Sequence, residues 1–94
     1  MNTKLIRFRS GEDVLCDLVN ETDTEISIDN ALVAVPQGQG QLGFAPWSPL
    51  AKEKEPLTVP RNYVVYIAEG NPDIVEQYES IFSTLITPKK QLVL

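Results

Sequence analysis

Alternating apolar and polar positions run through the first two thirds of the chain and predict a series of short strands. In the segment from Thr3 to Arg9, Ile6 and Phe8 alternate with charged residues, which is the period of two expected of a half-buried strand. A Ser-Gly pair follows, and glycine is the residue that best tolerates the positive φ of a tight turn. The pattern therefore predicts a first strand that ends in a tight turn at Ser10 and Gly11, which joins it to a second strand.

The second and third strands follow from the same alternation. A second strand over residues 13–20 places Val14, Cys16 and Leu18 on one face. After a polar turn, a third strand is predicted over residues 24–35. These strands together indicate a small, strongly bent antiparallel barrel.

Prolines and glycines shape the fourth and fifth strands. Residues 36–41 combine glutamine with proline and glycine and predict a loop. A fourth strand over residues 42–50 contains Pro46 and Pro49, which cannot donate ladder hydrogen bonds, so we expect an edge, bulged or bent strand. Residues 57–68 complete the strands, interrupted by a Pro-Arg-Asn turn. The Tyr-Val-Val-Tyr-Ile run after that turn is rich in the β-branched and aromatic residues that strands favour.

The period changes after residue 70 and predicts one C-terminal helix. Asn71 suits the N-cap, Pro72 the first helical position and Asp73 the first turn. Apolar residues then recur at helical spacing and form one stripe: Ile74, Val75, Tyr78, Ile81, Phe82 and Leu85. The helix is expected over about residues 72–86, with a tail over residues 87–94.

Composition indicates one domain over residues 1–94, with the strands over about residues 3–69. The chain has 94 residues and is 43% hydrophobic, enough for one small core that oligomerisation would usefully supplement. No targeting signal or membrane-spanning stretch is recognised in the sequence. The single cysteine, Cys16, suits a reducing compartment. We therefore expect a cytoplasmic protein without a membrane partner.

Charge and residue types argue against catalysis. Eight basic and thirteen acidic residues give a net charge of −5, which counts against nonspecific binding to a nucleic-acid backbone. The sequence has no histidine and only one cysteine, and no metal-ligand spacing or nucleophile motif is recognised. The prediction is that the protein is not an enzyme and uses no metal or cofactor.

Two segments resemble the two sequence motifs of Sm-like (LSm) proteins, over roughly Lys4 to Ala68. The turn glycine and the apolar positions of the second and third strands match the first motif: Gly11, Val14, Leu18, Ile26, Ile28, Asp29 and Ala31. The closing strand matches the second motif: Asn62, Val64, Val65, Tyr66 and Ile67. The resemblance implies a mostly β fold. With the C-terminal helix predicted above, the expected fold is a small, strongly bent five-stranded antiparallel barrel of the Sm-like (SH3-like) type, with an extended hairpin between its third and fourth strands and one C-terminal α-helix.

The resemblance also implies assembly into a homo-oligomeric ring, between a pentamer and a heptamer. In the family, the fourth strand of one copy pairs with the fifth strand of the next, so that neighbours satisfy exposed edges. The corresponding interface residues here are Tyr63, Val64, Val65, Tyr66 and Ile67. Family members bind single-stranded uridine-rich RNA around the central pore through two loops.

Several positions depart from the family pattern. A glycine that lets the second strand bend is Cys16 here. The base-binding loop is shorter, and the Arg-Gly of the second motif is replaced by Pro60 and Arg61. The family helix is usually N-terminal, whereas the predicted helix here is C-terminal. These changes affect uridine recognition more than the fold.

Candidate RNA contacts follow from the two loops that the resemblance singles out. They are Arg61, Asn62, Thr24, Asp23 and Glu25. Arginine suits planar recognition of a base or a phosphate, but these residues can equally be ordinary turn residues, with the arginine paired to an acid on its own surface. A ring of acids would repel phosphate and favour a basic protein or a cation.

Two further groups have competing interpretations. Trp47, between two prolines, either stacks on a base or anchors a partner, or packs under the helix or at a subunit joint. Lys4, Arg7 and Arg9 form either a solvated sheet face or a peripheral RNA track.

Two functions therefore stay open. The first is a ring-forming protein that holds single-stranded RNA at its pore. The alternative is a ring-shaped scaffold or protein-interaction adaptor that has lost RNA binding.

Overall fold

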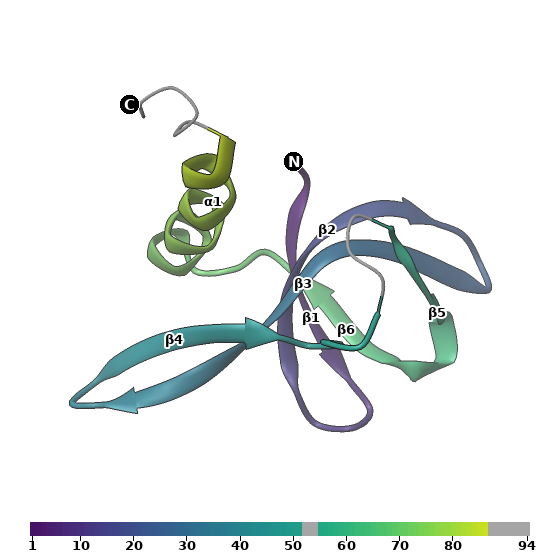
Figure 1. The fold of residues 1–94 in the computed structure, drawn as a ribbon. Coiled ribbons are helices and arrows are strands. Elements are labelled where there is room, and N and C mark those ends of the chain that lie inside the picture. Colours follow the sequence, from purple (N-terminus) through teal and green to yellow (C-terminus); the bar gives the residue numbers. More distant parts are fainter. Residues whose placement is uncertain (52–54, 87–94) are drawn as a thin grey trace.

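The computed structural model describes residues 1–51 and 55–86 and shows one antiparallel sheet with a C-terminal helix (Figure 1). The strands and helices are β1 Thr3–Phe8, β2 Asp13–Glu21, β3 Glu25–Gly38, β4 Gln41–Pro46, β5 Leu57–Pro60, the 3-10 turn η1 Arg61–Tyr63, β6 Val64–Ala68 and α1 Pro72–Ile86. The predicted mostly β class and the C-terminal helix are confirmed. The predicted tail, residues 87–94, lies outside the described residues.

The strand order is β4-β3-β2-β1-β6, and β5 also pairs with β3. The sheet of the described residues is not closed into a barrel, and it has six strands where the sequence predicts five. The extra strand arises because the segment over residues 57–68 is divided by η1 into β5 and β6; the predicted fourth strand is a single strand that ends at Pro46 rather than near residue 50. Both β4 and β5 pair with β3, at opposite ends of that long strand.

The predicted turn between β1 and β2 is confirmed. Gly11 has φ 98°, in the left-handed region that glycine adopts without steric cost. Its N–H donates to the Phe8 carbonyl at 2.8 Å. The two strands then run antiparallel, with Ile6 opposite Val14.

The core lies on one face of the bent sheet. Val14, Cys16 and Leu18 are all buried, as the alternation in the second strand predicts. They pack with the buried side chains of the other strands: Ile6, Phe8, Ile26, Ile28 and Val59. Half-buried Trp47 belongs to this cluster as well.

Trp47 packs against the core. Its ring stacks on Phe8 with centroids 4.4 Å apart and planes inclined by 6°, an offset or parallel arrangement that aromatic pairs favour. Its indole N–H donates to the Glu12 carboxylate at 3.3 Å. Of the competing interpretations, the structure shows packing, although the partner is Phe8 of β1 rather than the helix.

The bend of the sheet is made in β3. Asp17 pairs with Asp29 and Leu15 with Leu32, so that two residues of β3, Asn30 and its neighbour, lie opposite Cys16 alone. This is a β-bulge, which bends the strand that carries it. Asn30 has φ 52°, a conformation that asparagine adopts more readily than other residues with a Cβ. β3 therefore bends at Asn30, and β2 has a bulge of its own at Val19, so neither strand relies on a glycine at position 16.

Beyond the bend, β3 and β4 form a hairpin that projects away from the rest of the sheet (Figure 1). We call residues 31–46 the hairpin and the other strands the body. The predicted loop over residues 36–41 is largely strand, because β3 extends to Gly38 and β4 begins at Gln41. The tip between them uses left-handed backbone at Gly38, Gln39 and Gly40.

The helix begins and ends where the sequence predicts. The Asn71 side chain accepts a hydrogen bond from the Asp73 N–H at 3.0 Å, which is the N-cap contact expected of asparagine. Tyr78, in the middle of the apolar stripe, is fully buried. Within the described residues, no helix is long and apolar enough to cross a membrane.

The bend supplies a stability prediction. Asn30→Val places a β-branched side chain in the left-handed region and should lower the free energy of unfolding by about 1–2 kcal/mol. Asn30→Gly, the matched control, has no Cβ and should leave that free energy within about 1 kcal/mol of the original. Urea unfolding followed by tryptophan fluorescence measures both. Equal stability of the valine and glycine variants would contradict the left-handed bend.

Candidate functional site

The five predicted RNA-contact residues lie together at one end of the sheet. Asp23, Thr24 and Glu25 belong to the turn between β2 and β3, and Arg61 and Asn62 to η1. The two segments meet because Glu25 pairs with the last residue of β5, directly before η1. The Arg61 N–H donates to the Thr24 carbonyl at 2.8 Å. We call residues 21–25 together with Arg61 and Asn62 the rim.

Thr22 holds the rim turn in shape. Its hydroxyl accepts hydrogen bonds from the N–H groups of Glu25 at 3.1 Å and Thr24 at 3.3 Å, and contacts the Glu25 carbonyl at 3.1 Å. Its own N–H donates to that carbonyl at 2.9 Å. Such threonine side chains offer backbone groups local partners in turns. The sequence interpretation did not single out Thr22, although a threonine in a polar turn is the signal that could have identified it.

Arg61 is paired with an acid of its own surface. Its guanidinium lies 2.6 Å from a Glu21 carboxylate oxygen, and Nη1 donates to the Thr22 carbonyl at 3.1 Å. The side chains of both ion-pair partners are 41% exposed. A surface ion pair of this kind contributes about 1 kcal/mol or less. The arginine is therefore oriented by the rim, but a competing anion can displace the carboxylate at little cost.

Negative charge outweighs positive charge at the rim. Glu21, Asp23 and Glu25 supply three carboxylates, against the single guanidinium of Arg61. All three acids are exposed, and so are Thr24 and Asn62. The rim can offer hydroxyl and amide groups to a base edge, but its charge balance disfavours close approach of several phosphates.

The basic residues of β1 are largely neutralised by neighbours. Lys4 forms an ion pair with Glu69. Arg7 binds the Asp13 carboxylate through Nε at 2.5 Å and Nη2 at 2.8 Å, and this hydrogen bonding holds the pKa of Asp13 below its usual value. The Tyr66 hydroxyl also contacts Asp13 at 3.3 Å. These pairings favour a solvated sheet face over a peripheral RNA track.

The predicted interface residues divide between the core and the surface. Tyr63 stacks near Phe8, with ring centroids 5.7 Å apart, and Val64 and Ile67 pack against the core. Val65 and Tyr66 are 58% and 41% exposed. One side of β6 pairs with β1, and the other side has no partner strand among the described residues.

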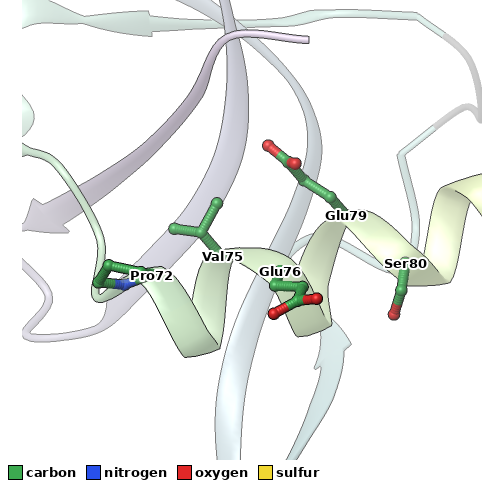
Figure 2. A pocket seen from close by; sticks show the side chains of 5 residues that line it. All are labelled: Pro72, Val75, Glu76, Glu79 and Ser80. Carbon is green, nitrogen blue, oxygen red and sulfur yellow. The ribbon is translucent and has the colours of Figure 1, made fainter.

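A shallow hollow on α1 is a weaker candidate. It is lined by residues of that helix alone: Pro72, Val75, Glu76, Glu79 and Ser80. Figure 2 shows that Val75 and Glu79 extend to one side of the helix and Glu76 and Ser80 to the other. In a ligand-binding site, the polar groups that orient the ligand point toward one shared space. Here Glu79 and Glu76 point to different sides of the helix, so the hollow lacks that feature of a binding site.

No metal or nucleophile site emerges from the described part of the chain. It contains no group of three or more histidine, cysteine or acidic residues that could hold a metal ion. Burial raises the pKa of the Cys16 thiol to about 12, so the thiol is protonated at neutral pH and a poor nucleophile.

Comparison with known proteins gives no assignment. No protein family matches the sequence, and no curated protein matches it significantly. The function is therefore inferred from the strand arrangement and from the rim.

The rim turn supplies a second prediction. Thr22→Val is nearly isosteric but removes the hydroxyl that binds the N–H groups of Thr24 and Glu25. The amide of Glu25 should then exchange with solvent about fivefold faster, as measured by hydrogen exchange with NMR detection. Thr24→Val leaves the Thr22 hydroxyl in place and serves as the control. If both variants exchange at the original rate, Thr22 does not hold the turn.

Proposed function

We propose that this protein is a ring-forming member of the Sm-like class and binds single-stranded RNA at the centre of the ring. Copies would join by pairing β4 of one with β6 of the next. The strand order supports this, because β4 and β6 end the order and each has one side without a partner strand among the described residues. A ring satisfies both edges with one repeated contact.

The distribution of charge supports burial of these two edges. Residues 30–51, which include β4, contain no charged side chain, although the chain carries eight basic and thirteen acidic residues elsewhere. The β6 sequence Val-Val-Tyr-Ile-Ala is uncharged as well. Edge strands that stay in solvent usually carry charges or other features that prevent pairing. Leu42 on β4 and Val65 on β6 are instead exposed apolar residues.

One observation carries the RNA proposal: the backbone N–H of Arg61 donates a hydrogen bond to the backbone carbonyl of Thr24. It holds η1 against the β2–β3 turn, which are the two segments that correspond to the RNA-binding loops of Sm-like proteins. Arg61 would contact a phosphate or a base, and Asn62 and Thr24 would contact base edges. A ring of five to seven copies would repeat these weak contacts, so that their combined strength far exceeds that of one copy.

The charge of the rim favours a second candidate, a ring-shaped adaptor that binds protein and not RNA. Three carboxylates accompany each Arg61, which is itself paired with Glu21. A ring multiplies this surplus of negative charge in every copy. Such a surface would repel a phosphate backbone and attract a basic protein segment.

The assembly can be tested at β6. Val65→Glu introduces a carboxylate at an exposed position of the proposed joint, where unpaired charge should prevent strand pairing. We expect rings for the original protein and monomers for the variant, measured by size-exclusion chromatography with light scattering. Val19→Glu is the matched control, because Val19 is similarly exposed (52%) but lies on β2, so this variant should still form rings. A monomeric original protein at high concentration would contradict the proposal.

RNA binding can be tested by removing single charges from the rim. Fluorescence anisotropy with a labelled uridine-rich oligonucleotide should show binding that weakens as salt increases. Arg61→Ala should weaken it at least about tenfold, since a charged hydrogen bond is lost in every copy. Glu21→Gln releases Arg61 from its ion pair and should strengthen binding about fivefold.

Lys4→Ala is the control for net charge, because it also removes one positive charge but from the ion pair with Glu69, not from the rim. It should leave the affinity within about twofold of the original once salt exceeds about 0.1 M. Absence of RNA binding by intact rings at low salt would reject the RNA proposal and favour the adaptor.

A further inference from the structure

We infer that Tyr78 is a positioning residue that sets the angle between the hairpin and the body, and through that angle the number of copies in the ring. This inference rests on the proposed assembly. It concerns a residue of the helix that lies outside the region resembling Sm-like proteins.

Within the described residues, β3 runs from the body into the hairpin through the bend. Before the bend it pairs with β2 and β5; beyond the bend it pairs with β4 and, at Leu32 and Val33, still with β2. Between them, Asn30 adopts left-handed backbone at the bulge. Its N–H donates to the carboxylate of the preceding Asp29 at 2.9 Å, and its carbonyl accepts a hydrogen bond from outside the sheet.

Tyr78 supplies that partner. Its hydroxyl donates to the Asn30 carbonyl at 2.7 Å. The tyrosine is fully buried, and burial raises the pKa of its hydroxyl above the usual value, so it remains a neutral donor. The ring also meets Phe44 of β4 edge-on, with centroids 6.4 Å apart. One side chain thus contacts the bend and the second strand of the hairpin.

The helix that carries Tyr78 is itself fixed to the body. The Thr3 hydroxyl of β1 donates to the Glu79 carboxylate at 2.6 Å, and Thr3 is buried. Figure 1 shows α1 above the hairpin and to one side of the start of β1. The helix therefore contacts both parts. On the hairpin side, Tyr78 contacts Phe44 and the Asn30 carbonyl. The Gln77 amide also donates to the Leu42 carbonyl at 3.5 Å.

The angle between hairpin and body matters because the two strands that would pair with neighbouring copies lie on opposite sides of the bend. β4 lies on the hairpin, whereas β6 pairs with β1 in the body. A closed ring requires that the rotation between successive copies divides a full turn, about 72° for a pentamer and about 51° for a heptamer. A change of about 10° in the bend would therefore add or remove one copy.

The test is Tyr78→Phe, which removes the hydroxyl and keeps the aromatic ring of the side chain. Native mass spectrometry should show one copy number for the original protein, and at least two copy numbers, or a shifted one, for the variant. Hydrogen exchange of amides 31–46 should become about tenfold faster, because one buried hydrogen bond is lost. Ser10→Ala is the control: it removes a hydroxyl that contacts Glu12 in the β1–β2 turn of the body, away from β4 and β6, and should change neither result.

The outcomes separate this inference from the proposed assembly. A single, unchanged copy number and unchanged exchange in Tyr78→Phe rings would overturn the inference and leave the ring intact. A monomeric original protein would overturn the assembly and the inference with it. If circular dichroism shows that Tyr78→Phe does not fold, Asn30→Gly is the second variant, because glycine widens the range of the bend. It should give mixed copy numbers, and a single unchanged copy number would then overturn the inference.

Discussion

The bulge in β3 is the constraint on which the rest of this structure depends. One strand serves two parts of the molecule: its first half pairs with β2 and β5 in the body, and its second half pairs with β4 in the hairpin and, at Leu32 and Val33, still with β2. The change of direction requires a residue that accepts positive φ, and Asn30 provides it. The body then holds the core, η1 and β6, while the hairpin carries the other open edge. The proposed assembly needs both edges in a fixed relation.

Much of this fold follows from sequence pattern, because local periodicity decides which face of each strand is buried. The apolar face of β2 and the capped helix are recovered closely, since Val14, Leu18 and Asn71 act through near neighbours. The bulge is not predictable in this way. It depends on a two-against-one pairing between Asn30 and Cys16 across two strands. The division of the segment over residues 57–68 similarly depends on distant strands, because β5 pairs with β3 and β6 pairs with β1.

The site shows the same limit. Resemblance to Sm-like motifs selected the two loops that form the rim, and the structure brings them together. The sequence offered pairing of Arg61 with an acid of its own surface as one alternative, but it could not identify Glu21 as that acid, because the contact depends on the register that sets β5 beside β3. This single contact changes the balance between the functions. An arginine already neutralised by its own chain makes RNA binding depend on displacement of a carboxylate, and it gives the adaptor a physical argument as well.

The central claim is that β4 of one copy and β6 of another form a continuous antiparallel ladder. A crystallographic or cryo-electron microscopic structure of the assembled protein tests it most directly, because main-chain N–H and carbonyl groups of the two strands must then lie about 2.9 Å apart. The account predicts this ladder at every joint, with the rim of each copy facing the central opening. A structure in which β6 has no intermolecular partner, or pairs with another β6, would contradict it.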